Sequence, residues 1–358
     1  MILRDPLRTA CISLLAILPM IPSISGATPI ATPRASPEAS PVSDILPIEM
    51  VAQLTGVAGV NDTFADYGVY GTDLGHTFMA RDEMYMIFGD TFGANRSDWR
   101  SSTAAVITDD DPSDGLTFDR MITDREGHAR ELIPSKKIDF DEITVIPTYG
   151  VAVGDRLVLH YMSVRHWGEP GHWELGSSGW AWSDDAGQTW TREPAATWPG
   201  DSNFGQVAIE EFEGHLYIFG IPGGRFGGVH LARVVPERIL SIDTYEYWDG
   251  SAWVAGDPAA ATTIVPAPVG ELSVRWNSYY NAWVMMYLNE EKYAIVLRTA
   301  DEITGPWSDE HVVATGVDYP ALYAPYQFPK WNDGPDIFFT MSMFGPYQVY
   351  LMKTSLPN

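Results

Sequence analysis

The sequence holds one cysteine, Cys11, among 358 residues, and it is poor in basic side chains. Lys and Arg together number 22 against 47 Asp and Glu, which gives a formal net charge of −25. Nucleic acids and anionic membrane surfaces require a basic partner, so neither is expected to bind this protein. A neutral ligand such as a glycan meets no such repulsion.

Several catalytic motifs are also missing. The sequence has no G-x-S-x-G nucleophile turn and no phosphate-binding G-x-x-x-x-G-K-[ST] loop. Its eight histidines form no H-x-x-x-H pair, which disfavours a zinc hydrolase. We therefore predict no metal and no cofactor.

The N-terminus has the pattern of a secretory signal. Arg4 and Arg8 precede an apolar run over residues 10–21, and residues 25–27 (Ser-Gly-Ala) offer a cleavage site after Ala27. The run is too short for a membrane span. We predict a signal peptide over residues 1–27, and a mature protein that contains no thiol and is secreted or tethered at the cell surface.

Residues 28–45 are rich in Pro, Ala, Ser and Thr, which is typical of an extended linker. The folded domain is therefore predicted over residues 46–358. Hydrophobic residues make up 45% of the chain, enough for a large core, so disorder over the whole length is excluded. We expect this domain to be a monomer.

A weak internal repeat runs through the folded part. Five apolar runs begin at Met84, Arg156, His215, Trp283 and Asp336. A shorter β-rich segment with a polar residue inside it precedes each run, and another β-rich segment follows it. Four strands per unit, repeated around an axis, predict an all-β, five-bladed β-propeller.

The last repeat ends at Asn358 without a fourth strand. Residues 48–54 precede the first blade and have no other partner, so we predict that they close the ring as the outer strand of blade five. Residues 183–190, SDDAGQTW, resemble the Asp-box turn of sialidases and related propellers. We interpret this turn as structural.

The first strand of each blade lines the central channel of a propeller, and polar residues there converge on one pocket. The residues predicted to lie there are Asp73, Glu142, Asn203, Gln206, Glu271, Tyr323 and Tyr326. Asp90 adds a carboxylate at the end of the strand that pairs with the Asp73 strand. Several acids at one mouth suit glycoside hydrolysis, which needs one carboxyl group as proton donor and another as base or nucleophile.

Asp73 and Asp90 are the candidate catalytic pair. Both are flanked by glycine and small residues, which permit the close approach of a ligand. The alternative interpretation is that each aspartate caps a turn. If they are close together, repulsion between the two charges keeps one of them protonated near neutral pH.

Four residues on predicted loops are candidates for the rim of the pocket. His172 and Trp173 lie in a polar, glycine-rich loop and could form a platform for a sugar. Trp99 and Arg100 follow the strand that ends in Asp90 and could reach the same rim. We assign all four, together with Glu142, Asn203, Gln206, Glu271, Tyr323 and Tyr326, to substrate binding.

Seven segments occur in order over residues 66–353: YGVYGTDLG, FGDTFG, YMSVRHWGEPGHW, SSGWAWSDDAGQTW, YEYWDGSAW, GELSVRWN and MSMFGPYQVYLMK. Together they resemble a bacterial family known as domain of unknown function 4185, which includes the endo-D-arabinanases of glycoside hydrolase family 183. The resemblance implies a five-bladed propeller that cleaves α-linked D-arabinofuranosyl chains of arabinogalactan or lipoarabinomannan. By motif match it places the catalytic pair at Asp73 and Asp90.

Two alternatives remain open. A sialidase-like hydrolase would need three arginines for the sugar carboxylate, and Arg275 is the single arginine in the predicted inner strands. A glycan-binding propeller without catalysis would keep the aromatic residues, but it has no need of two carboxylates at the mouth. The polysaccharide partner is common to both the enzyme and the binding hypothesis.

Overall fold

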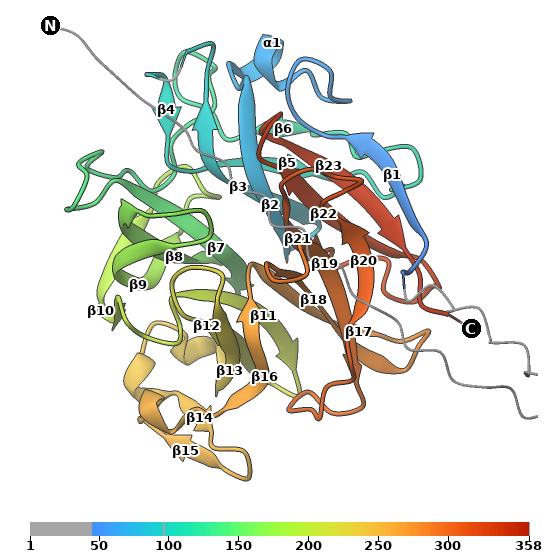
Figure 1. The fold of residues 1–358 in the computed structure, drawn as a ribbon. Helices are drawn as coiled ribbons and strands as arrows, with labels where there is room; N and C mark the ends of the chain where they lie inside the picture. Colours follow the sequence, from blue (N-terminus) through green and yellow to red (C-terminus); the bar gives the residue numbers. More distant parts are fainter. Residues whose placement is uncertain (1–44, 96, 358) are drawn as a thin grey trace, which may run out of the picture. The chain divides into compact units, whose positions relative to one another are not determined.

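A computed structural model describes residues 45–95 and 97–357. The predicted signal peptide and all but the last residue of the predicted linker lie outside these residues. The described chain forms five antiparallel sheets, so the prediction of an all-β five-bladed propeller is confirmed (Figure 1). No helix of the described ranges is long and apolar enough to cross a membrane.

The blades follow one another along the chain, and each begins with its inner strand. Blade 1 holds β2 (Gly71–Ala80), β3 (Glu83–Phe92), β5 (Thr103–Ile107) and β6 (Arg120–Met121), and β4 (Trp99–Arg100) pairs with β3. Blade 2 holds β7 (Thr144–Val153), β8 (Arg156–Trp167), β9 (Trp173–Ser183) and β10 (Thr191–Pro199). Blade 3 holds β11 (Gln206–Phe212), β12 (His215–Ile221), β13 (Gly227–Val234), β14 (Glu246–Trp248), β15 (Trp253–Ala255) and β16 (Thr263–Val269).

Blade 4 holds β17 (Leu272–Asn277), β18 (Ala282–Asn289), β19 (Ala294–Ala300) and β20 (His311–Thr315). Blade 5 holds β21 (Leu322–Gln327), β22 (Ile337–Met343), β23 (Gln348–Thr354) and β1 (Ile48–Gln53). The short helix α1 (Thr63–Tyr67) leads into β2, and the single turns η1 (Pro236–Arg238), η2 (Ile242–Thr244) and η3 (Pro258–Ala260) lie between strands of blade 3.

The second strand of each blade is an almost continuous apolar run. In β12, for example, every residue after His215 is buried. A blade packs between two other blades, so both faces of its middle strands are covered and the usual alternation of polar and apolar residues is lost. This burial explains why the five apolar runs are the most visible repeat in the sequence.

Blade 3 departs from the four-strand pattern. Its third strand, β13, pairs with β16 and also with β14, which continues into β15. The long segment between β13 and β17 supplies this extra hairpin, seen in yellow in Figure 1.

The first and last strands of the domain close the ring. β1 pairs antiparallel with β23, from Ile48 opposite Thr354 to Gln53 opposite Tyr350, with an irregularity between Met50 and Ala52. Figure 1 shows this pairing as blue beside red. The predicted closure is confirmed.

The core beside this closure gives a test of its contribution to stability. Leu54 is fully buried and packs in one cluster with Val349 and Leu351 of β23. We expect Leu54→Ala to lower the free energy of unfolding by about 2–5 kcal/mol, through lost burial and the cavity left behind. Met50→Ala, on the exposed side of β1, is the control and is expected to change it by less than about 0.5 kcal/mol in urea denaturation. Equal effects of both variants would contradict a packed closure.

Candidate active site

The starts of the inner strands gather polar residues at one mouth of the ring. Asp73 is the third residue of β2, Gln206 the first of β11 and Tyr323 the second of β21. Glu142 and Glu271 lie within two residues of the starts of β7 and β17. The inner strands contact one another around the ring, so these positions surround one end of the channel.

A bulge in β2 sets the position of Asp73. The pairing of β2 with β3 shifts on both sides of Leu74, and Leu74 and Gly75 have φ values of 69° and 87°. Leucine in this left-handed region is strained, and bulges of this kind turn a side chain away from the regular alternation. Ser342 of β22 accepts the amide hydrogen of Leu74 at 2.9 Å, and Thr340 donates to the carbonyl of Gly75 at 3.2 Å.

The Asp73 carboxylate is held by two tyrosines. Its Oδ2 accepts a hydrogen bond from the hydroxyl of Tyr323 at 2.8 Å, and the hydroxyl of Tyr347 also interacts with the carboxyl group. Its Oδ1 is buried and has no partner among the described protein atoms. A Cβ at Gly89 would lie 2.5 Å from this Oδ1, so the glycine leaves room for the aspartate itself.

Burial is the main reason that the pKa of Asp73 rises from 3.8 to about 7, and the charge of Asp90 raises it further. The hydrogen bonds from Tyr323 and Tyr347 act in the opposite direction. Burial raises the pKa of Tyr323 well above 10, and the charge of Asp73 is the second cause of this rise. The phenol therefore stays protonated and remains a hydrogen-bond donor. Asp73 can therefore carry a proton close to neutral pH.

Asp90 lies near the end of β3 and is 8% exposed. Its Oδ1 accepts from Nε1 of Trp99 at 2.7 Å and from the hydroxyl of Thr144 at 2.5 Å. Burial raises its pKa to about 6, while these two donors and the charge of Lys137 oppose the rise. The ammonium of Lys137 lies 4.2 Å from the centre of the Trp99 ring. Trp99 thus contacts one member of the candidate pair.

A third carboxylate, Glu271, faces the same end of the channel. Arg225 donates to its Oε1 from Nε at 3.0 Å and from Nη2 at 2.8 Å, and to Glu290 at 3.0 Å. Oε2 of Glu271 is buried with no partner among the described protein atoms. Gln206 donates to the carbonyl of Gly224 at 2.8 Å and so holds the loop that carries Arg225.

Two of the predicted rim residues lie beside this arginine. The Trp173 ring centre is 5.7 Å from the guanidinium of Arg225. His172 is exposed and stacks on Phe226 with ring centres 4.3 Å apart. Asn203 is half-buried in the turn before β11.

Other predicted site residues are engaged elsewhere. Glu142 accepts hydrogen bonds from Arg192 and from Ser163, both of blade 2, at 2.7 and 2.8 Å. Burial opposes ionisation of Glu142, but these hydrogen bonds prevail and lower its pKa. Arg100 donates to Asp98 and to the carbonyl of Gly68, and not to Asp73 or Asp90.

The channel below the carboxylates is filled by rings. Tyr326 packs edge-on against His76 at 5.6 Å, and His76 stacks on Tyr149 at 5.5 Å. Burial lowers the pKa of His76 to about 3, so its ring is neutral. These rings therefore form a floor beneath the end of the channel that carries Asp73 and Asp90.

Sequence reasoning missed several residues that contact the candidate site residues, among them Tyr347, Arg225, Thr144 and Phe226. Arg225 and Phe226 interrupt a glycine-rich loop directly after an apolar strand, a signal that could have marked them as rim residues. Tyr347 lies in the turn between β22 and β23 with φ of 57°, and nothing in the sequence around it indicates that it turns back to Asp73.

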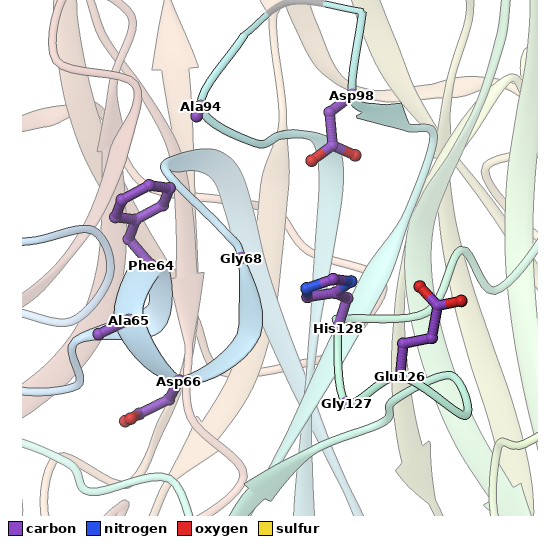
Figure 2. Close-up of a pocket in the computed structure, with 9 residues that line it drawn as sticks. All are labelled: Phe64, Ala65, Asp66, Gly68, Ala94, Asp98, Glu126, Gly127 and His128. Atoms are coloured by element: carbon purple, nitrogen blue, oxygen red, sulfur yellow. The ribbon is translucent and has the colours of Figure 1, made fainter.

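A separate cavity of about 480 Å³ lies beside blade 1 (Figure 2). It is lined by Phe64, Ala65, Asp66, Gly68, Ala94, Asp98, Glu126, Gly127 and His128. Asp124, Glu126 and His128 bring possible ligand atoms within 4.8 Å of one another, and all three are exposed. Asp124 accepts the amides of the other two, which is the geometry of a turn cap, and the cavity excludes both Asp73 and Asp90.

The profile of a protein family described as domain of unknown function DUF4185 matches residues 58–353. The chain belongs to this family. Among the relatives of this DUF4185 protein is notoamide biosynthesis cluster protein J from Aspergillus sp. (strain MF297-2), 28% identical over 293 residues, which cover 74% of this chain and 77% of the relative.

Solved structures with a similar fold include glycoside hydrolases. A family 117 glycoside hydrolase from Zobellia galactanivorans has a TM-score of 0.50 at 10% identity, covering 87% of this chain and 91% of that one. An exo-β-1,3-galactanase from Phanerochaete chrysosporium has a TM-score of 0.51 at 10% identity, and the match covers 86% of this chain and 64% of the galactanase chain. At these identities the likeness concerns the fold.

Proposed function

We propose that this DUF4185 protein is a secreted glycoside hydrolase that cleaves α-linked D-arabinofuranosyl chains internally, with Asp73 and Asp90 as its carboxyl pair. The observation that carries this proposal is the pair itself. Asp73, half-buried on β2, and Asp90, buried on the paired strand β3, have pKa values raised to about 7 and about 6. Glycoside hydrolysis requires one protonated and one ionised carboxyl group in the same site.

The hydrogen-bond partners favour one division of roles. Asp90 accepts from Trp99 and Thr144 and has the lower pKa, so it is the ionised member and acts as base or nucleophile. Asp73 has the higher pKa and an Oδ1 without a partner among the described protein atoms, so it is the proton donor. In the reaction Asp73 gives its proton to the leaving glycosidic oxygen, while water activated by Asp90, or Asp90 itself, forms the new bond to C1.

The substrate class follows from charge and resemblance. The mouth holds Asp73, Asp90 and Glu271 within a protein of net charge −25, which suits a neutral polymer and the positive charge that develops on the sugar ring in the transition state. The sequence motifs resemble the endo-D-arabinanases of family 183, and structural neighbours include glycoside hydrolases. These observations together support D-arabinan as the substrate that we propose.

The two alternatives fit the site less well. A sialidase needs free arginines for a sugar carboxylate, but Glu271 and Glu290 already engage the guanidinium of Arg225. A propeller that only binds glycans has no need of two neighbouring carboxyl groups with raised pKa values, because taking such groups out of water costs stability. The name of the Aspergillus relative states a gene cluster and no reaction.

The proposal is tested by incubating the purified protein with D-arabinan, L-arabinan and arabinogalactan. We expect new reducing ends from D-arabinan, with a ladder of oligosaccharides early in the reaction, because internal cleavage shortens chains before it releases small products. Release of a single small sugar from the start would contradict internal cleavage. No new reducing ends from any of the three polymers would contradict the proposed hydrolysis.

A further inference from the structure

The loop 222–226 of blade 3 carries Arg225, which contacts Glu271 at the end of the channel. Gln206 donates to the carbonyl of Gly224, and the amide of Arg225 donates to the carbonyl of Gly171 in blade 2 at 3.0 Å. These contacts tie the loop to an inner strand on one side and to the next blade on the other. The loop therefore has a fixed place beside the carboxylates.

Arg225 connects this loop to the candidate catalytic pair. Its guanidinium lies 4.9 Å from the centre of the Tyr323 ring, and the hydroxyl of Tyr323 donates to Asp73. The same guanidinium holds Oε1 of Glu271, whose Oε2 is buried without a partner among the described protein atoms. Glu271 is 6% exposed, and a buried carboxylate oxygen without a donor is costly unless a ligand or water supplies one.

Phe226, the next residue, presents a ring to solvent. It remains 41% exposed although it stacks on His172 at an interplanar angle of 14°. A Cβ at Gly171 would lie 2.9 Å from Cε2 of Phe226, so this glycine lets the ring lie close to the loop of blade 2. Two loops from different blades thus cooperate to display one stacked pair of rings at the mouth.

We propose that the Phe226–His172 stack is a binding subsite for the sugar next to the bond that is cleaved. In the same proposal, Oε2 of Glu271 accepts a hydrogen bond from a hydroxyl of the sugar whose glycosidic bond is cleaved. This inference rests on the proposed function. The C–H face of a neutral furanoside packs on an aromatic ring, and its hydroxyl supplies the donor that Glu271 lacks. Glu271 and Glu290 beside Arg225 disfavour acidic sugars at this subsite.

The subsite predicts a dependence on chain length. We expect Phe226→Ala to lower kcat/KM on polymeric D-arabinan about tenfold, equivalent to about 1.4 kcal/mol, and to lower it less than about threefold on a short aryl arabinofuranoside that does not reach the subsite. Phe226→Tyr keeps the ring and is expected to retain near wild-type activity. Phe212→Ala is the matched control, because Phe212 is 36% exposed at the opposite end of β11 in the same blade. It should leave kcat/KM unchanged on both the polymer and the short substrate.

Binding separates this inference from the proposed reaction. Affinity electrophoresis in D-arabinan is expected to show retarded migration of wild type and Phe212→Ala, and less retardation of Phe226→Ala. If wild type cleaves D-arabinan and Phe226→Ala matches it on the polymer, the subsite is wrong and the proposed function stands. If wild type binds without cleaving and Phe226→Ala loses binding, the subsite stands and the hydrolysis is wrong. If wild type neither binds nor cleaves D-arabinan, both are wrong.

Discussion

Asp73→Asn is expected to lower kcat/KM on a cleaved arabinan by at least about 10²-fold, the usual scale for loss of a general acid or base. The amide can still accept the hydrogen bond from Tyr323, but it cannot give a proton to the leaving oxygen. Asp90→Asn is expected to lose activity to a similar extent, because the amide cannot activate water or attack C1. Initial rates of reducing-end formation measure both effects.

The two roles also predict the pH dependence. Activity requires Asp90 ionised and Asp73 protonated, so kcat/KM of wild type should rise around pH 6, fall around pH 7 and form a narrow bell. Asp155→Asn is the control, since Asp155 is exposed and pairs with Arg81 away from the pocket. A turnover of Asp73→Asn close to that of wild type would make Asp73 a turn cap, and the role of proton donor would pass to Glu271.

The same substitution is expected to stabilise the protein above neutral pH. The pKa of Asp73 is raised from 3.8 to about 7 in the folded state, so between these values the folded protein holds a proton that the unfolded chain has lost. The free energy of unfolding of wild type therefore falls as pH rises from about 4 to about 7. Above pH 7 the ionised Asp73 lowers the free energy of unfolding by its full amount, at most about 4 kcal/mol. Asp73→Asn removes this destabilisation.

Urea denaturation of wild type and Asp73→Asn at pH 8 and pH 5 measures this effect. The variant should be the more stable protein at pH 8, and its advantage should shrink at pH 5, where the carboxyl group of wild type is mostly protonated. Asp90→Asn should gain less, because its pKa is raised less and the amide weakens the hydrogen bonds from Trp99 and Thr144. An Asp73→Asn variant that is less stable than wild type at pH 8 would contradict burial as the cause of the raised pKa.

The strand pattern is sufficient to predict the ring, its closure and the neighbouring positions of Asp73 and Asp90. Each of these follows from local signals: apolar runs, a polar residue within a strand, and a missing last strand. The orientation of the Asp73 side chain is not predictable in this way, because the next residue, Leu74, adopts a strained φ that no local pattern indicates. The bulge persists because Ser342 and Thr340, which are 268 and 265 residues from their partners in the chain, satisfy its backbone groups.

Partners distant in sequence also decide which acids belong to the site. Glu142 and Glu271 occupy equivalent places before inner strands, and no local pattern separates one from the other. Arg192 donates to both oxygens of Glu142, whereas Arg225 donates to one oxygen of Glu271 and the other is buried without a partner among the described protein atoms. The two glutamates therefore differ through their arginine partners. Arg192 comes from strand β10, and Arg225 comes from a loop that does not correspond to β10 in the repeat.

The pairing of β1 with β23 sets the order of events when the chain is made. The hydroxyl of Thr55 donates to Gln348 across 293 residues, so the ring stays an open arc until the final strand has been synthesised. Asp73, although it lies in the first blade, obtains its Tyr323 and Tyr347 partners from the last one. Loop closure over such separations is slow and comes late. The proposed active site is therefore completed only when blade five joins the ring, and a chain that stops before blade five carries Asp73 and Asp90 without Tyr323 and Tyr347.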